Sequence, residues 1–236
     1  MADDIIGHIV DAIPLMVAPD RFWRREGANL LALSGEQAID LNLLVIGERE
    51  GAERFLADGI AAARARGLPL LVLIAVPGLA APGLMQDGTA PVMVLRAGSP
   101  VAPAGECEVA RVTEPEIAGP LQAAAFDLPE AAMTALLDAS LRLADAPAVY
   151  LAGRDGVPMS SVTLTRHGDT AGIWTMATPP EHQSKGAGRA LLTRVIDEWR
   201  RDGVRRFYLF ASEAGRPLYE SLGFETAGLL TCWPSV

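Results

Sequence analysis

One stretch of the sequence combines the residue types, in the order, that an anion-binding site requires. Two prolines, Pro179 and Pro180, end a strand-like segment, and Gly186 and Gly188 begin a helix-like one. Glycine costs about 1 kcal/mol relative to alanine inside a helix, but it lets a ligand approach the backbone closely. The first turn of a helix also carries unsatisfied N–H groups and a partial positive charge. The segment therefore predicts a binding site for an anion, and phosphate is the usual anion.

The local charge agrees with this prediction. Residues 181–206 contain seven basic and four acidic side chains, although the whole chain has a formal net charge of −9. Most of these arginines fit a solvated helix face. Lys185, the single lysine of the chain, and Arg189 lie beside the glycines instead. We expect Lys185 to supply a flexible positive charge there.

Two well-known phosphate-binding patterns do not fit. In a P-loop the lysine follows the last glycine and precedes serine or threonine, whereas Lys185 precedes its glycine. A dinucleotide-binding loop would have glycine or alanine at position 191, which is Leu191 here. A nicotinamide-dependent enzyme is therefore disfavoured.

A third pattern fits residues 183–188. It has glutamine or arginine at its first position, glycine at its fourth, and glycine or alanine at its sixth, which are Gln183, Gly186 and Gly188 here. It resembles the acyl-CoA pyrophosphate loop of the GNAT superfamily of N-acetyltransferases. Residues 177–182 resemble the strand end before that loop. Residues 206–224, with Tyr219 followed by Gly223 and Phe224, resemble the next strand and short helix. The resemblance covers residues 106–232.

The resemblance implies a role for each residue of this segment. The backbone of Met176, Ala177 and Thr178 is expected to pair with the pantetheine arm of acetyl-CoA. Seven residues are expected to surround the pyrophosphate: Gln183, Ser184, Lys185, Gly186, Ala187, Gly188 and Arg189.

Tyr219 matches the tyrosine that, in the family, donates a hydrogen bond or a proton to the departing sulfur. Its ordinary pKa of about 10 exceeds the value of about 8.5 for a thiol, so hydrogen-bond donation is favoured over full early proton transfer. Ser212 stands where the family often has asparagine, which weakens its assignment as a helix cap or a contact to the CoA arm. Pro217 predicts that its helix begins near Gly215.

The resemblance implies acetyl-CoA as cosubstrate and no metal. The general base is not identified by the sequence. Four side chains are candidates, and a water relayed through backbone carbonyls is equally open: Asp127, Glu181, His182 and Glu213.

Hydrophobic periodicity predicts the elements that position these residues. Helices are expected at 4–17, 52–66, 116–126, 130–143 and 186–202, near 78–85, and in a short segment ending at Gly223. Strands are expected at 29–33, 41–46, 68–76, 91–95, 107–112, 148–152, 160–165, 172–178, 206–210 and 225–232.

Small residues, proline and glycine dominate 97–105, which predicts a linker. We therefore expect two domains, a degenerate GNAT-like domain at 1–104 and an acetyl-CoA-binding GNAT domain at 105–236. The expected fold class is α/β (α+β), with a mixed, mostly antiparallel central sheet flanked by helices in two tandem GNAT-like domains. Similar helix–strand patterns at 61–73 and 199–210 suggest an internal duplication. In the first half, Glu48 and Glu50 stand where an anion would bind, so this half is not expected to bind acyl-CoA.

Composition excludes several classes of protein. A net charge of −9 disfavours nucleic acid as a partner, because the phosphate backbone requires a broad basic face. No apolar run approaches the roughly 20 residues of a membrane span, and the acidic start does not predict a secretory signal. Two distant cysteines, Cys107 and Cys232, do not form a zinc pattern. We expect a cytoplasmic protein, either a monomer or a homodimer.

The predicted activity is direct transfer of an acetyl group from acetyl-CoA to the amine of a small-molecule or peptide acceptor. The alternative is a non-catalytic acyl-CoA-binding or regulatory module, because intact loop residues would support binding in both cases. No motif identifies the acceptor.

Overall fold

The computed structural model describes residues 2–17, 21–99 and 106–235. The chain forms two compact units, of which unit 1 contains residues 1–92 and 226–236 and unit 2 contains residues 93–225. The units do not divide the chain at a single point, because the C-terminal strand belongs to unit 1. The predicted boundary between 104 and 105 lies outside the described residues and stays a prediction.

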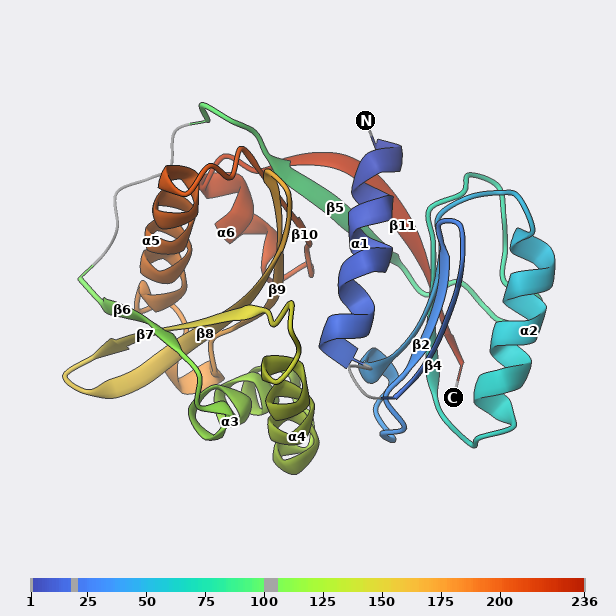
Figure 1. The fold of residues 1–236 in the computed structure, drawn as a ribbon, viewed down its shortest axis with the longest axis horizontal. Helices are drawn as coiled ribbons and strands as arrows, with labels where there is room; N and C mark the ends of the chain where they lie inside the picture. The colour runs from blue at the N-terminus through green and yellow to red at the C-terminus, as the bar shows by residue number, and fades with distance from the viewer. Residues whose placement is uncertain (1, 18–20, 100–105, 236) are drawn as a thin grey trace. The chain divides into compact units, whose positions relative to one another are not determined.

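Unit 1 is a mixed sheet with a helix on either side, as Figure 1 shows. The strands lie in the order β1-β2-β3-β4-β11, and only the pairing of β3 with β4 is parallel. Their bounds are β1 Phe22–Glu26, β2 Asn29–Leu33, β3 Asn42–Ile46, β4 Leu70–Ile74 and β11 Glu225–Ser235. The helices are α1 Ala2–Val17 and α2 Ala52–Arg64, and a short 3-10 turn, η1, covers Ile39–Leu41.

Unit 2 has the same layered arrangement. Its strands follow the order β10-β9-β8-β7-β6, and only β9 and β10 run parallel. Their bounds are β6 Glu108–Val112, β7 Ala148–Arg154, β8 Val157–His167, β9 Thr170–Ala177 and β10 Arg206–Phe210, and β5 Thr89–Leu95 contributes its last three residues. The helices are α3 Pro115–Phe126, α4 Glu130–Leu141, α5 Ala187–Arg201 and α6 Arg216–Ser221, with a 3-10 turn, η2, at Pro180–His182.

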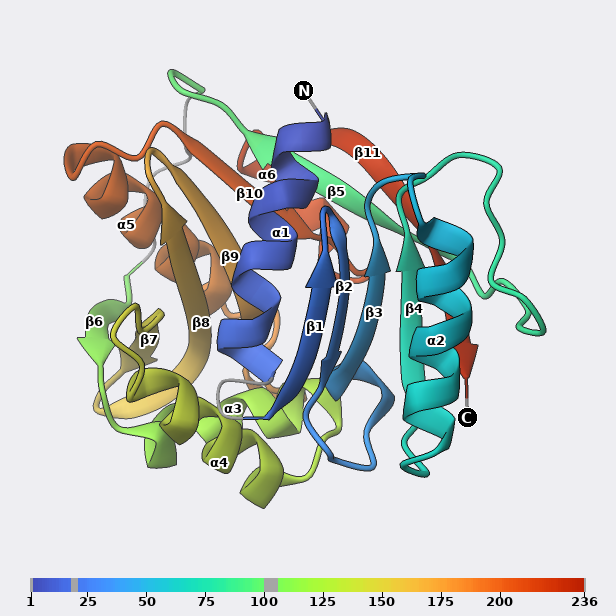
Figure 2. The same cartoon turned by 45° about the vertical axis from the view of Figure 1, so that its right-hand side comes forward.

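Alternation along β7 shows how the helices cover both faces of the sheet in unit 2. Tyr150 and Ala152 pack in the core formed with α5, whereas Val149 and Leu151 pack with α3 and α4. This is the period of two expected for a strand that is buried on both faces. In Figure 2, α5 and the α3–α4 pair accordingly lie on opposite sides of β7 and β8.

Both units contain a strand–helix–strand crossover with parallel strands. In unit 1 it is β3-α2-β4, and in unit 2 it is β9-α5-β10. Each helix begins after a glycine in the left-handed backbone conformation, Gly51 with φ 67° and Gly186 with φ 83°. The similar helix–strand patterns in the sequence correspond to these two crossovers.

Two features of unit 1 differ from the sequence prediction. Residues 78–85 form turns, and the helix predicted there is wrong, because Gly78 and Gly83 adopt positive φ values of 73° and 74°. The strand β1 was not predicted. It lies at the end of the strand order and carries Arg24, Arg25 and Glu26, so it lacks a buried hydrophobic run.

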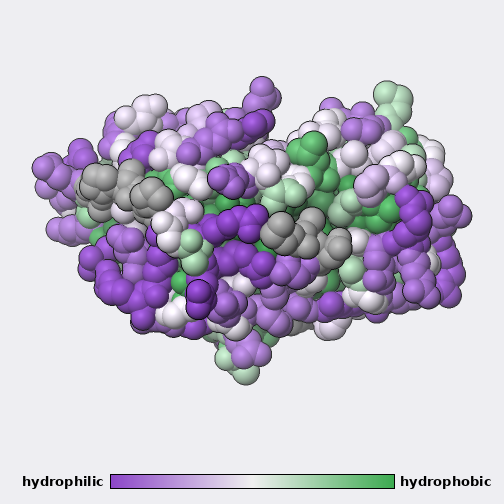
Figure 3. Space-filling model, turned by 90° about the horizontal axis from the view of Figure 1, so that it is seen from above, coloured by the Kyte–Doolittle hydropathy of each residue, from purple (hydrophilic) through white to green (hydrophobic). Residues whose placement is uncertain are grey.

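Figure 3 shows one face of the molecule, on which hydrophilic residues cover most of the visible surface and hydrophobic residues form separate patches. Most large apolar side chains are buried in the cores of the two units. Among residues 2–17, 21–99 and 106–235, no helix is both long and apolar enough to cross a membrane.

The close approach of α3 to α4 generates a prediction about stability. A Cβ placed on Gly119 would lie 2.9 Å from the backbone Cα of Thr134, which cannot move aside cheaply. Gly119→Ala should therefore lower the free energy of unfolding by about 1–3 kcal/mol, measured by urea denaturation. Gly7 of α1 is the matched control, because no described atom lies within 4 Å of its Cβ position. Gly7→Ala should instead stabilise by about 0.5–1 kcal/mol, and equal effects of the two changes would contradict the packing argument.

Candidate functional site

A cavity of about 510 Å³ lies in unit 2, where α3 ends, β9 ends, and α5 and α6 begin. This volume falls in the range of about 300–1,000 Å³ that is usual for small-molecule sites. The lining residues are Ala125, Phe126, Met176, Thr178, His182, Gln183, Ser184, Gly186, Ala187, Gly188, Arg189, Ser212, Ala214, Gly215, Leu218 and Tyr219.

Gly186 shapes the loop that forms one end of the cavity. Its φ of 83° is a conformation that L side chains rarely adopt, and no described atom lies within 4 Å of the position of a Cβ there. The helix α5 begins at the next residue, so the amides of its first turn have no partner within the helix. An open loop and helix amides without partners in the helix are the features that an anion site requires, and the predicted site stays a prediction.

Gly188 has a different reason to be glycine. A Cβ at this position would lie 3.0 Å from Met176 Cε and 3.2 Å from Thr178 Oγ1. Gly188 therefore allows the first turn of α5 to pack against the end of β9. The sequence interpretation, close approach of a ligand, stays a prediction for both glycines, which line the cavity.

Hydrogen bonds tie the end of β9 to its surroundings. Ser160 Oγ donates to the Ala177 carbonyl at 2.7 Å and lies 2.8 Å from Thr178 Oγ1. Gln183 Nε2 donates to the Thr178 carbonyl at 3.1 Å. Ala177 is fully buried and does not line the cavity as described. Ser160, which no motif distinguishes, is thus part of the support of this wall.

The positive charge at the cavity comes from Arg189. This side chain is half-buried, lines the cavity and donates from Nη2 to Ser221 Oγ at 2.8 Å. Lys185 is exposed in the adjacent loop and is not one of the described lining residues. Arg200 and Arg206 bond to Ser99 and Thr170 instead, so they serve the fold of unit 2.

Tyr219 lies on α6 with 7% of its surface exposed. Burial raises the pKa of Tyr219 to about 12, so its hydroxyl stays protonated at neutral pH and can donate a hydrogen bond. The helix begins at Arg216, immediately after Gly215, which confirms the start predicted from Pro217. Ser212 Oγ accepts a hydrogen bond from the Gly215 amide at 3.1 Å, just before the helix begins.

The four candidates for a general base are placed differently. His182 lines the cavity, and its Nδ1 is buried with no hydrogen-bond partner in the part of the chain that the structure describes. Asp127, Glu181 and Glu213 are exposed and are not among the described residues that line the cavity. His182 is therefore the candidate that the geometry favours.

Several lining residues were not found by sequence reasoning. They are small or apolar side chains, and neither their type nor their spacing carries a chemical signal: Ala125, Phe126, Ala214 and Leu218. Gly215 was named only as a helix start. The site assignments made from the sequence stay predictions, although most of them fall on this one cavity.

Comparison with known proteins identifies the segment that contains this cavity. Residues 117–224 match the family model described as "Acetyltransferase (GNAT) family". A stretch of 62 residues is 42% identical to the [Ribosomal protein bS18]-alanine N-acetyltransferase of Escherichia coli (strain K12), and 40% identical to that of Salmonella typhimurium. The matched stretch covers 25% of this chain and 42% of each of these relatives.

Solved structures extend the similarity to the whole chain. A GCN5-related N-acetyltransferase from Kribbella flavida superposes with a TM-score of 0.70 at 20% identity, covering 98% of this chain and 95% of that one. A tandem GNAT protein from the clavulanic acid biosynthesis pathway superposes with a TM-score of 0.60 at 15% identity, covering 99% and 95%. These likenesses confirm the predicted fold class, a mixed and mostly antiparallel sheet flanked by helices. Residues 117–224 of this chain therefore form a domain of the acetyltransferase (GNAT) family.

Proposed function

We propose that this protein is an N-acetyltransferase that transfers an acetyl group directly from acetyl-CoA to the amine of a small-molecule or peptide acceptor. One observation carries the proposal. A single cavity is lined by an open glycine loop, the first turn of α5, Arg189 and Tyr219, whose hydroxyl stays protonated at neutral pH. These groups fit an elongated substrate that has phosphates at one end and a thioester at the other.

The lining residues are of two kinds, polar ones near the start of α5 and apolar ones on α3 and β9. The loop residues Ser184 and Gly186, together with Arg189, bind the pyrophosphate through amides and one cation. The substrate then extends along β9 toward Met176 and Phe126, which offer an apolar surface to its acyl end. Binding both reactants in this arrangement replaces a bimolecular encounter with a positioned one.

The reaction forms a C–N bond and breaks a C–S bond. The amine nitrogen attacks the thioester carbon, and the sulfur leaves while it accepts a hydrogen bond from the Tyr219 hydroxyl. The amine must also lose a proton, and the imidazole of His182 or a water molecule takes it. The high pKa of Tyr219 favours a hydrogen-bond donor over an acid that ionises during turnover.

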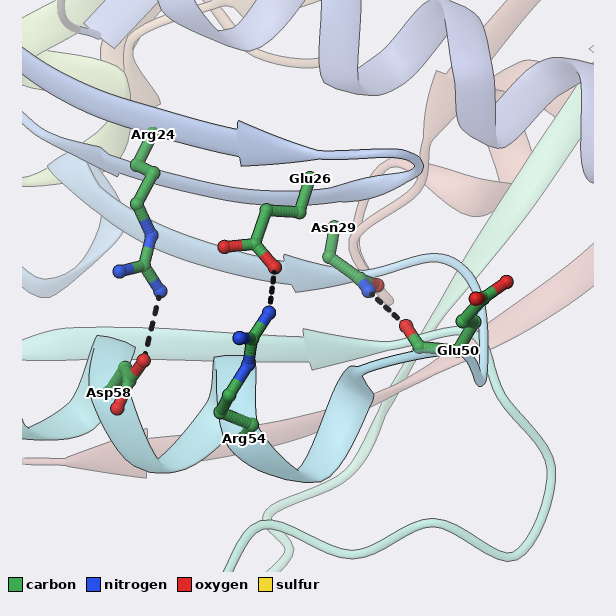
Figure 4. Close-up of polar contacts among 6 residues, drawn as sticks. All are labelled: Arg24, Glu26, Asn29, Glu50, Arg54 and Asp58. Carbon is green, nitrogen blue, oxygen red and sulfur yellow. Dashed lines mark hydrogen bonds and ion pairs between the residues drawn. The ribbon is translucent and has the colours of Figure 1, made fainter.

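We further propose that unit 1 does not bind acetyl-CoA. In the loop before α2, one buried side chain occupies two amides, because Asn29 Oδ1 accepts from Gly47 and Glu48 at 3.1 and 3.3 Å. Asn29 Nδ2 also donates to the Glu50 carbonyl at 3.2 Å (Figure 4). An asparagine thus fixes the part of this loop at Gly47 and Glu48, whereas Gly51 itself is as open as Gly186.

Charges around α2 strengthen that contrast. Figure 4 shows Arg54 paired with Glu26 at 2.6 Å and Arg24 paired with Asp58 at 3.5 Å, which joins α2 to β1. These arginines are paired with carboxylates, and Glu48 and Glu50 add negative charge to the loop. Negative charge at this position repels a pyrophosphate.

The proposed acceptor is the amine of a peptide or of a small molecule. The relatives that match 62 residues have names that specify the alanine of a ribosomal protein, which supports a peptide amine. A screen of amines and peptide N-termini, with release of free thiol as the readout, tests the proposed reaction.

The open loop at Gly186 leads to the first prediction about binding. Gly186→Glu should reduce acetyl-CoA affinity by about 100-fold in calorimetry, because a carboxylate would occupy the place of the pyrophosphate. Gly51→Glu is the matched control, since Gly51 has the same left-handed backbone and the same free space before α2. It should leave acetyl-CoA affinity unchanged. A binding constant for Gly186→Glu that matches the wild type would refute the loop assignment.

The second prediction compares the two cations beside the loop. Arg189→Ala should weaken acetyl-CoA binding by about tenfold, since this half-buried guanidinium lines the cavity. Lys185→Ala should weaken it by only about twofold, as expected for an exposed and well-solvated charge. A larger loss for Lys185→Ala than for Arg189→Ala would show that the lysine closes over the bound substrate.

The third prediction concerns Tyr219. Tyr219→Phe should lower turnover by about tenfold or more while acetyl-CoA affinity changes by less than about threefold. Because burial raises the pKa of Tyr219 to about 12, the ratio of wild-type to variant rates should stay constant across neutral pH. The ratio should fall only above about pH 11, as the pH approaches the raised pKa of Tyr219 of about 12.

Tyr150→Phe is the control for Tyr219→Phe. Tyr150 is equally buried in unit 2, but its hydroxyl bonds to Glu198 and Trp199 outside the cavity, so its loss should lower stability and leave turnover intact. Full activity of Tyr219→Phe would remove this residue from the mechanism. Acetyl-CoA binding without thiol release for any amine would instead favour a non-catalytic acyl-CoA-binding module.

A further inference from the structure

The strand β9 contains an irregularity directly beside the cavity. Opposite the step from Ser161 to Thr163 on β8, the paired residues on β9 step from Ala177 to Trp174, which is one residue more. This is the geometry of a β-bulge, in which the extra residue interrupts the ladder and re-aims the strand. Met176, which lines the cavity, lies between Trp174 and Ala177 and therefore belongs to the bulge.

Backbone strain is concentrated at the same place. Thr175 has a φ of 42°, a value that is an outlier for a β-branched residue. Such a conformation costs about 1–3 kcal/mol and persists only where the surroundings impose it. Contacts with neighbouring residues must therefore stabilise this backbone conformation of Thr175.

A chain of buried hydrogen bonds supplies that contact. The Thr175 hydroxyl donates to Thr163 Oγ1 at 2.9 Å, and Gln122 Nε2 donates to the same oxygen at 3.2 Å. Thr163 and Gln122 are 0% and 1% exposed. Gln122 belongs to α3 and lies one turn before Ala125 and Phe126, which line the cavity. One threonine oxygen on β8 thus joins the α3 wall to the β9 wall.

We propose that Gln122 and Thr163 are positioning residues that hold the β9 bulge so that the cavity wall at Met176 receives the acetyl group of acetyl-CoA. The inference rests on the proposed function, which directs the acyl end of the substrate along β9. A bulge leaves a backbone amide outside the ladder, and this amide is free to bond to a carbonyl oxygen. Hydrogen bonds that fix the bulge therefore affect the acetyl end of the substrate and not its phosphate end.

Thr163→Val tests this role, because valine keeps the shape of threonine and removes the shared acceptor. The variant should lose about five- to tenfold in affinity for acetyl-CoA, while affinity for CoA without an acetyl group stays within about twofold. Gln122→Met should have the same selective effect. Thr163→Ser, which keeps the hydroxyl, should restore acetyl-CoA affinity.

Thr165→Val is the matched control. Thr165 is buried on the same face of β8, two residues along, and accepts a hydrogen bond from Trp174 Nε1 at 2.8 Å. It pairs with Gly172 in the regular part of the ladder, outside the bulge. Thr165→Val should leave both affinities as in the wild type, and thermal unfolding of each variant checks that it is folded.

The outcomes separate the two proposals. A wild type that binds neither acetyl-CoA nor CoA would overturn the proposed function, and the positioning role with it. A wild type that binds both, with Thr163→Val weakening the two equally or behaving like Thr165→Val, would overturn the positioning role alone. If Thr163→Val fails to fold, Gln122→Met replaces it in this comparison. Thr163→Ser remains the variant that should keep wild-type affinity for acetyl-CoA.

Discussion

The rest of the site depends on the left-handed backbone at Gly186. With φ at 83°, the chain leaves the loop after β9 and enters α5 without placing a side chain over the first helical turn. Since β9 and β10 run parallel, α5 must cross between them, and its N-terminus comes to lie beside the end of β9. The free amides of the helix therefore face the same cavity as Met176 and Thr178.

Unit 1 repeats this backbone arrangement with different chemistry. A glycine with φ of 67° again precedes the helix, and parallel strands again flank it. There, however, buried Asn29 bonds to three backbone groups of the loop, and ion pairs join α2 to β1. The two units therefore share a strand–helix crossover and differ in the side chains that surround it.

Two buried residues of β8 in unit 2 form hydrogen bonds that hold β9 beside the cavity. Ser160 supports the end of β9 from one neighbour position, and Thr163 supports its bulge from another. Both are fully buried polar residues, and their hydroxyls bond to residues beside the lining ones, Ser160 to Ala177 and Thr163 to Thr175. Buried polar contacts of this kind specify one geometry, because breaking any of them leaves an unpaired group in a dry interior.

The sequence by itself determined the fold class, most helices and strands, and the glycine loop at Gln183–Gly186 that leads into α5, because these depend on local periodicity and on glycine chemistry. Tertiary structure alone decided which residues meet at the cavity. Phe126 and Leu218 carry no motif, Lys185 proved exposed where Arg189 is half-buried, and Gly188 serves helix packing. It also decided the strain at Thr175, the edge strand β1, and the membership of β11 in unit 1. The physical reason is that burial, strand register and hydrogen bonds between distant residues arise only when separate segments pack together, and no local pattern of residue types records them.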